Sequence, residues 1–337
     1  MSGEHGFRPD PVRARALDAR MRRELARSLA HITEQLDAHA EARGLAASLT
    51  PVVDRVRSNG RVSPAAFGGY YQLAVSLLDD RPDVAERIAA LERFTAPRSE
   101  LSFKDLSAEG LGDPTLLSLY LGALNSGDEM GFAFLPPTPE QSRATQESVM
   151  RGLALMRRTA PDLAGEFEAL VIEILLAAAS EEPGAARFDG ASSYQLWGAL
   201  ALSVDDAKSD LEMMETLAHE AGHSFLFGMT VDEPLVHNHD ADLYQSPLRV
   251  DPRPMDGIYH ATFVSARMHY AMRQARHSGL LDERSLDECD RYLEASAKSF
   301  ASGHSVVASE GNLSETGRRL MEDAARYMDR AIVPAER

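Results

Sequence analysis

The feature that most constrains this chain is a pair of histidines placed four residues apart inside an apolar, helical pattern. The stretch LAHEAGHSF (217–225) contains His219, Glu220 and His223. Polar side chains on a core-facing stripe cost free energy unless something satisfies them. Because residues four apart on a helix project from the same face, both imidazoles can reach one metal ion. The pattern H-E-x-x-H therefore predicts a helix that carries a metal site on its buried face.

The sequence also indicates where this helix begins and how it packs. Ser209 to Glu212 has the form S-x-x-E of a capping box, which places the start of the helix just ahead of Leu211. Gly222 lies in the middle of the helix, where glycine costs about 1 kcal/mol relative to alanine. We therefore expect another element to pack closely against Gly222.

Two histidines hold a metal weakly, so a third ligand is expected elsewhere in the chain. His260 is the preferred residue, because it falls early in the helical stretch MDGIYHATFVSARM, where a fixed backbone can aim it. Asp256, one turn earlier, is either the third ligand itself or a residue that orients His260. His237 and His239 lie in the loop LVHNHDADLYQ, and either could reach back to the metal, but we expect them to be ordinary loop residues.

The periodicity of the remaining sequence predicts a fold that is mainly α with a small β-sheet (α+β), with the motif helix packed beside the sheet. Residues 1–128 are expected to form a helical N-terminal part and residues 129–337 a metal-binding catalytic part, together one continuous globular unit. Residues 167–179 are a strand or a buried helix. The sequence further predicts helices over residues 11–42, 64–94, 114–124 and 255–276, a helix beginning at 138–140, and strands at 130–135 and 193–204.

Charge and composition exclude several classes of partner. The net charge of −17 disfavours binding to nucleic acid or to an anionic membrane surface. No apolar run is long enough to cross a membrane, and the charged N-terminus lacks the apolar core of a secretory signal. The single Cys289 fits a reducing compartment and excludes a cysteine-based zinc site. We expect a cytoplasmic protein with no nucleic acid and no membrane partner, and a homodimer is left open.

The motif helix and a block downstream of it resemble a known family. The residues SPLRVDPRPMDGIYHATF (246–263), placed after HEAGH (219–223), are similar to the HExxH-motif peptide-modification family. WGALALSV ahead of the helix and LYQSP in the loop extend the resemblance to roughly residues 130–320. The chain departs from the commonest pattern at Leu248, where an aromatic residue often follows the Ser-Pro pair. The N-terminal hundred residues resemble nothing that we can place.

The resemblance implies a function and a set of site residues. Members of the family are Fe(II)- and 2-oxoglutarate-dependent β-hydroxylases of ribosomally synthesised precursor peptides. By this resemblance, His219, His223 and His260 are the iron ligands, and three protein ligands leave positions open for the 2-oxo acid and dioxygen. The distal carboxylate of 2-oxoglutarate needs a cationic partner, and an arginine can donate hydrogen bonds to both carboxylate oxygens. For this role we favour Arg253 and then Arg249.

Two other functions remain open from the residues alone. In a zinc metallopeptidase of HExxH type, Glu220 would be the general base that activates water on Zn(II). In an oxygenase, Glu220 would instead orient ligands or contact the substrate. The strand predicted at 193–204 can pair with an extended peptide by edge addition in either enzyme. The third alternative is a peptide-binding protein with a degenerate metal site. We expect Trp197, the only tryptophan, to lie in the core.

Overall fold

The structure is a computed structural model that describes residues 6–58, 60–98, 100–126, 133–180, 188–248 and 251–332. The chain divides into two compact units, each assembled from separate segments. The first, here called the histidine unit, comprises Met1–Arg15, Glu147–Ala169 and Lys208–Arg337, and the second, the sheet unit, comprises Ala16–Gln146 and Leu170–Ala207. These units differ from the two consecutive parts expected from the sequence, residues 1–128 and 129–337.

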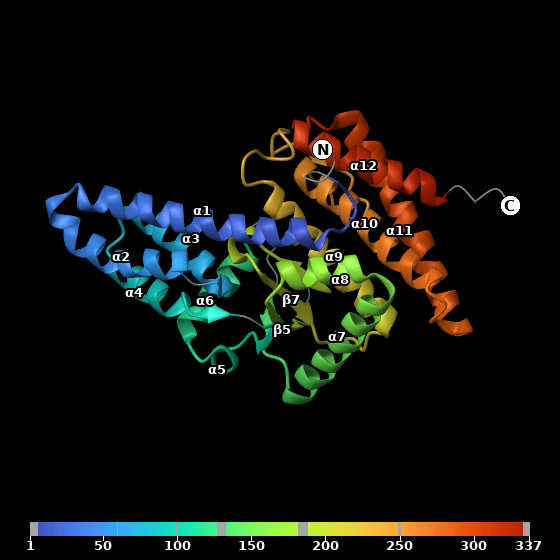
Figure 1. The fold of residues 1–337 in the computed structure, drawn as a ribbon, viewed down its shortest axis with the longest axis horizontal. Coiled ribbons are helices and arrows are strands. Elements are labelled where there is room, and N and C mark those ends of the chain that lie inside the picture. The colour runs from blue at the N-terminus through green and yellow to red at the C-terminus, as the bar shows by residue number, and fades with distance from the viewer. Residues whose placement is uncertain are drawn as a thin grey trace. The chain divides into compact units, whose positions relative to one another are not determined.

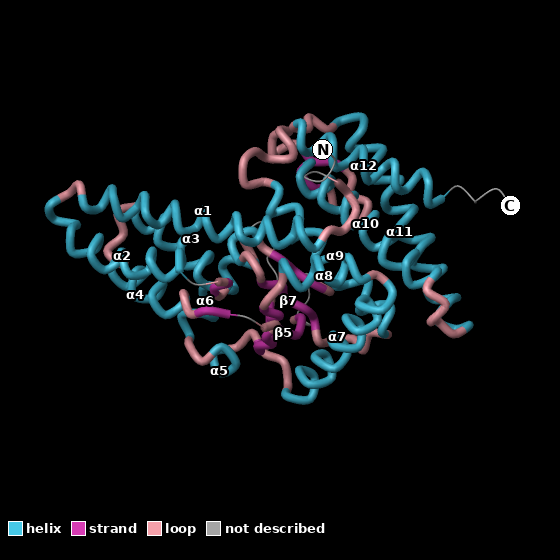
Figure 2. The backbone as a smooth tube through the Cα atoms, in the orientation of Figure 1, coloured by secondary structure: helices cyan, strands magenta, loops and turns pink. Residues whose placement is uncertain are grey.

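Helices dominate both units, and the strands are few and short, so the predicted fold class, mainly α with a small β-sheet, is confirmed (Figures 1 and 2). The elements that lie wholly or mainly in the sheet unit are α1 (Pro11–Asp37), α2 (Arg43–Ser58), β1 (Arg61–Val62), α3 (Pro64–Leu78), α4 (Val84–Phe94), β2 (Pro97–Arg98), β3 (Ser102–Asp105), α5 (Ala108–Leu111), α6 (Pro114–Leu124), β4 (Phe134–Leu135), β5 (Glu173–Ala179), β6 (Gly190–Ser192) and β7 (Ala199–Ser203). Those of the histidine unit are α7 (Pro139–Thr159), α8 (Pro161–Leu170), α9 (Asp210–Met229), β8 (Leu243–Tyr244), β9 (Arg253–Pro254), α10 (Met255–His277), α11 (Glu283–Glu310) and α12 (Glu315–Ile332). None of the helices in the described ranges has the length and apolar character needed to cross a membrane.

Two predicted helices are shorter than expected. The helix predicted over residues 64–94 is interrupted between α3 and α4, where Asp80 adopts a φ of 51° and Pro82 follows. The residue before a proline is disfavoured in the helical region, so the chain turns there. The helix predicted over 11–42 likewise ends at Asp37 and is followed by a 3₁₀ turn and by α2.

The main sheet of the sheet unit has the order β3-β5-β7-β6, and β4 pairs with β5. Strand β5 runs parallel to both β3 and β7, whereas β6 is antiparallel to β7. The ambiguous stretch 167–179 contains both alternatives, since α8 ends at Leu170 and β5 begins at Glu173. Residues Ile174 to Ala177 are buried, as is usual for a strand with neighbours on both sides.

The strand predicted at 193–204 is shorter than expected and is not at an edge. Tyr194–Leu196 form a 3₁₀ turn, and Gly198, with a φ of 93°, redirects the chain into β7. Because β5 and β6 occupy both sides of β7, the predicted pairing of a peptide with this strand is wrong. The indole nitrogen of Trp197 donates a hydrogen bond to Asp18 over 3.1 Å, and the side chain is buried, which confirms its place in the core.

The histidine unit is organised around α10, which packs against α9, α11 and α12. The motif helix α9 begins at Asp210, as predicted. Ser209 caps it, since its hydroxyl accepts a hydrogen bond from the backbone nitrogen of Glu212 over 3.0 Å. A Cβ atom on Gly222 would lie only 2.9 Å from Cγ1 of Val264 on α10. The expected close approach at Gly222 is therefore confirmed, and it brings α9 and α10 together next to the motif.

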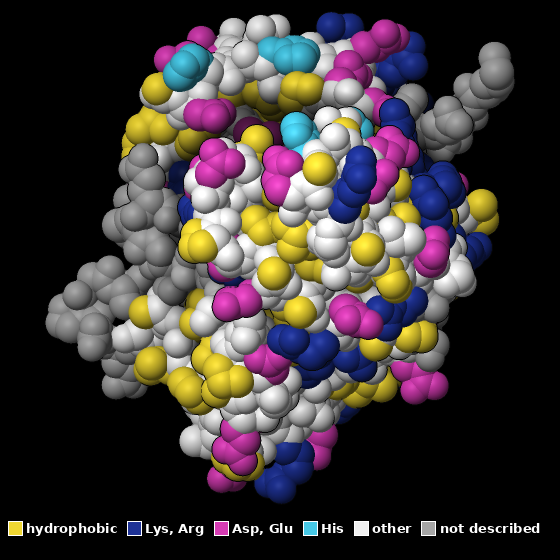
Figure 3. Space-filling view, turned by 90° about the vertical axis from the view of Figure 1, so that its left-hand side faces the viewer, with side chains coloured by type: hydrophobic (Ala, Val, Ile, Leu, Met, Phe, Trp, Pro, Cys, Tyr) yellow, Lys and Arg dark blue, Asp and Glu magenta, His cyan; other side chains and the backbone are white. Residues whose placement is uncertain are grey.

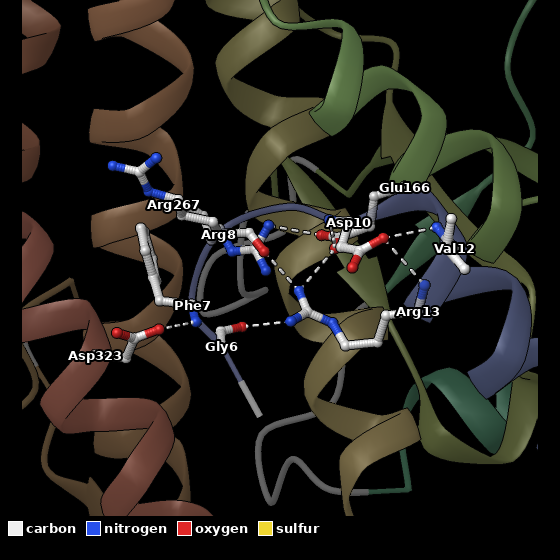
Figure 4. A network of polar contacts seen from close by, with 9 residues as sticks. All are labelled: Gly6, Phe7, Arg8, Asp10, Val12, Arg13, Glu166, Arg267 and Asp323. Carbon is white, nitrogen blue, oxygen red and sulfur yellow. Dashed lines mark hydrogen bonds and ion pairs between the residues drawn. The ribbon is translucent and has the colours of Figure 1, made fainter. Parts of the chain in front are cut away.

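A buried ionic network ties the N-terminal segment into the same unit (Figure 4). Glu166 on α8 accepts hydrogen bonds from the backbone nitrogen of Asp10, from Arg13 and from Arg267. The backbone nitrogen of Phe7 donates to the carboxylate of Asp323 on α12 over 2.6 Å. The network thus joins α8, α10 and α12 to a segment that precedes α1.

Candidate metal centre

His219, His223 and His260 lie in a row, with His223 in the middle. The Nε2 atoms of His219 and His223 are 3.1 Å apart, and the Nδ1 atoms of His223 and His260 are also 3.1 Å apart. Two of the rings come from one face of α9, as the spacing of four predicts. His260 comes from the second turn of α10, so the packing of α10 on α9 brings the third ring to the pair.

The row is not a closed coordination sphere. The two nitrogens of an imidazole point in different directions, and each nitrogen of His223 faces a different neighbour. Accordingly, no three or more His, Cys, Asp or Glu side chains in the described ranges form a group that could hold a metal ion. The pair on α9 nevertheless has a suitable separation, because two nitrogens bound side by side at about 2.1 Å from one metal lie about 3 Å apart.

Burial favours the neutral form of His223 and His260, which carries the lone pair that a metal needs. The pKa of His223 is held well below its usual value by burial, then by the neighbouring His219 and His260. The pKa of His260 is also lowered by burial, and the carboxylate of Asp256, 4.0 Å from Nε2 of His260, partly opposes this shift. Imidazole nitrogens are suitable ligands for iron and for zinc.

Glu220 lies beside the row, as its position in the motif predicts. Its side chain is buried, and Oε1 is 3.9 Å from Nε2 of His219. A carboxylate at this position can orient His219 or accept a proton from a molecule held at the histidines.

Two further side chains border the histidines, and sequence analysis missed both. The sulfur of Met268 is 3.3 Å from Nδ1 of His219, and the ring of Phe227 lies 5.4 Å from that of His260 and 6.4 Å from that of His223. Helical spacing is the signal that points to Phe227, which follows His223 by four residues. Finding Met268 requires knowing which face of α10 meets α9, which local spacing does not give.

The residues proposed to bind 2-oxoglutarate lie just ahead of α10. Arg253 belongs to β9 and forms an ion pair of 2.8 Å with Asp251, whose side chain is 52% exposed. Arg249 lies outside the residues that the structure describes.

The other loop histidines stay apart from the row. His237 and His239 are exposed, and among the described contacts neither ring meets His219, His223 or His260. Asn238 between them fixes the loop, because its amide donates to the backbone oxygen of Glu310 and accepts from the backbone nitrogen of Asn312.

Comparison with models of known protein families gave no match, and comparison with curated proteins gave none either.

Proposed function

We propose that this chain is an Fe(II)- and 2-oxoglutarate-dependent dioxygenase that β-hydroxylates residues of a ribosomally synthesised precursor peptide. The observation that carries the proposal is the contact of three imidazoles from two packed helices, at nitrogen separations of 3.1 Å. The resemblance of residues 246–263 to the peptide-modification family supplies the choice of iron and of the co-substrate. A cytoplasmic location belongs to the proposal and is compatible with the free, buried thiol of Cys289.

In the proposed site, His219 and His223 would hold iron, since their Nε2 atoms lie 3.1 Å apart. His260 is proposed as the third ligand, and its side chain would have to rotate, because its Nδ1 atom faces Nδ1 of His223 and not the nitrogen of His223 that faces His219. Bound iron supplies the activation of dioxygen, with 2-oxoglutarate oxidised to succinate and carbon dioxide as the peptide carbon gains a hydroxyl group. The ring of Phe227, beside those of His223 and His260, would shield this point in part from water.

Arg253 is proposed to bind the distal carboxylate of 2-oxoglutarate. One of its partners, Asp251, has a half-exposed side chain, so water can solvate that carboxylate when Arg253 turns to the co-substrate. A fork-shaped guanidinium can then bind both oxygens of the distal carboxylate.

The test is a product assay with purified protein, Fe(II), ascorbate, 2-oxoglutarate and candidate peptides. We expect succinate to form together with a one-oxygen mass gain on a peptide. A His260→Ala variant should form neither product, and a His277→Ala variant, altered at the exposed end of the same helix, should form both. The absence of succinate with every peptide in the panel would contradict the proposal.

The position of Glu220 favours a second candidate function, a zinc metallopeptidase. A buried carboxylate next to His219 is where such an enzyme places its general base. The same assay separates the two functions. Peptide cleavage that depends on Zn(II), is lost in Glu220→Gln and yields no succinate would favour the peptidase. In the dioxygenase, Glu220→Gln should leave succinate formation within about tenfold of the parent value.

A further inference from the structure

A groove with a basic wall lies on the sheet unit, where α1 passes α2. Its volume is about 440 Å³, and its lining contains one acidic side chain, Glu34. Figure 3 views the molecule from the side where α1 meets α2, and basic side chains gather in clusters on that face between scattered acidic ones. The basic residues that line the groove are Arg22, Arg23, Arg27, His31 and Arg57.

The charges of this wall are largely uncompensated. Arg23 and Arg57 are exposed, and neither has a hydrogen-bond or ion-pair partner in the described ranges. Arg27 forms an ion pair with Glu24 over 3.4 Å, and the side chain of Arg27 is 81% exposed. Arg22 alone is held in place, by Asp18. Because the whole chain carries a charge of −17, such a concentration of free arginines is not a result of its composition.

The dimensions of the groove fit a short extended peptide. Arg23 and Arg27 lie one helical turn apart, and the wall from Arg23 to Glu34 spans about 16 Å at 1.5 Å per residue. An extended chain rises about 3.3 Å per residue, so this length takes about five residues. Side chains on one side of such a chain repeat at about 6.6 Å, close to the spacing of Arg23 and Arg27. The buried side chains of Ala26 and Val56 provide an apolar floor.

We propose that this groove binds an acidic segment of a peptide, with carboxylates at alternate positions paired to Arg23 and Arg27 and a further contact to Arg57. The identification of that peptide as the unmodified part of the substrate rests on the proposed function. A short segment feels mainly the nearby arginines, because salt screens charges farther than about 10 Å away. A long polyphosphate chain would extend past the groove and meet the negative field of the whole protein.

The experiment measures binding without catalysis. Full-length, metal-free protein is titrated into a fluorescein-labelled decapeptide of alternating Glu and Ser, without 2-oxoglutarate and at about 0.1 M salt, and anisotropy is recorded. The matching Lys and Ser peptide, which the negative field of the whole protein attracts, is a second probe, and its binding should not weaken when groove arginines are replaced. Arg23→Glu/Arg57→Glu should weaken binding of the Glu and Ser peptide at least tenfold. The control Arg143→Glu/Arg158→Glu makes the same charge change at two exposed arginines outside the groove and should stay within twofold.

Circular dichroism checks that each variant folds, and Arg23→Gln/Arg57→Gln replaces the reversed-charge pair if the latter does not. Equal weakening by the groove and control variants would overturn the proposal. Absence of binding, or tighter binding of a single-stranded RNA of ten nucleotides, would also overturn it. The two proposals fail separately: binding without succinate in the product assay contradicts only the enzymatic function, and succinate without peptide binding contradicts only the groove.

Discussion

Arg267 donates a hydrogen bond to Glu166 over 2.6 Å, and solvent reaches neither side chain. The guanidinium carbon of Arg267 also lies 5.0 to 5.2 Å from the ring centroids of Phe7, Phe225 and Phe263. Its Nε and Nη2 atoms are buried without a hydrogen-bond partner, so the faces of these rings are what stabilises that side of the cation. Burial lowers the pKa of Arg267, and Glu166 opposes that shift.

Removing the charge of Glu166 should strongly destabilise the protein. Breaking a buried ion pair from one side leaves an uncompensated charge, so we expect Glu166→Gln to lower the free energy of unfolding by about 3 kcal/mol or more in a urea titration. Glu168→Gln, at an exposed pair with Arg157, should cost less than about 1 kcal/mol. Adding Arg267→Met to Glu166→Gln should restore part of the loss. An equal loss of unfolding free energy in Glu166→Gln and Glu168→Gln would show that the buried ion pair contributes no more than the exposed one.

Iron affinity should depend on His260 and not on a histidine elsewhere in α10. His260→Ala removes one of the three proposed ligands, and we expect the dissociation constant for Fe(II), measured anaerobically by competition with a chelator, to rise at least a hundredfold. His277→Ala, at the exposed end of the helix, should leave it unchanged. Similar affinity in both variants would remove His260 from the metal site.

A methyl group at Gly222 should destabilise the protein despite the better helix propensity of alanine. The added Cβ would meet Val264 at 2.9 Å and push α10 away from α9. Overpacking of this kind costs about 1 to 3 kcal/mol, against a propensity gain of about 1 kcal/mol. Gly122→Ala is the control, because a Cβ at that exposed helical position meets nothing within 4 Å, and it should raise the melting temperature. A melting temperature of Gly222→Ala at or above that of the parent would contradict the close packing.

Stability should fall between weakly acidic and weakly alkaline pH because of Glu215. Burial, then the nearby Glu212, raises the pKa of Glu215 to about 8, against an unperturbed value of 4.5. Between these values the folded chain keeps a proton that the unfolded chain has released, so the free energy of unfolding decreases as pH rises, by at most about 1.4 kcal/mol per pH unit. Glu215→Gln removes this dependence.

The measurement is the melting temperature of Glu215→Gln relative to the parent at pH 5 and at pH 8. We expect little difference at pH 5 and a gain of several degrees at pH 8. Glu294→Gln, at an exposed position on α11, should shift the melting temperature equally at both pH values. A gain for Glu215→Gln that is the same at pH 5 and pH 8 would refute the assignment.

Features that depend on a few neighbouring residues were predicted correctly from the sequence. The Ser209 cap, the run that becomes α10 and the close approach at Gly222 follow from hydrogen bonding, periodicity and the absence of a side chain. The sheet order and the two interleaved units depend on which distant segments pair, and no local pattern contains that information. For the same reason the position of β7 between two strands was missed.

In the candidate site, too, local spacing predicted some features, and others depend on how distant helices pack. The spacing of His219 and His223 fixes their common face, because helix geometry alone determines it. Which nitrogen of His223 faces His260 depends on side-chain rotation and on the packing of α10, so the row of rings was not foreseen. Glu166 and Arg13 gave no signal either, since a buried carboxylate is recognisable only once its partners surround it.

The contact of Phe7 with Asp323 joins residues that are 316 positions apart in the chain. On the ribosome, Phe7 is made long before α10 and α12, whose side chains form its binding site. Its ring therefore cannot reach its binding site before α12 has been made. Docking of this segment is then a late event in the folding of the histidine unit, and it depends on contacts of high sequence separation.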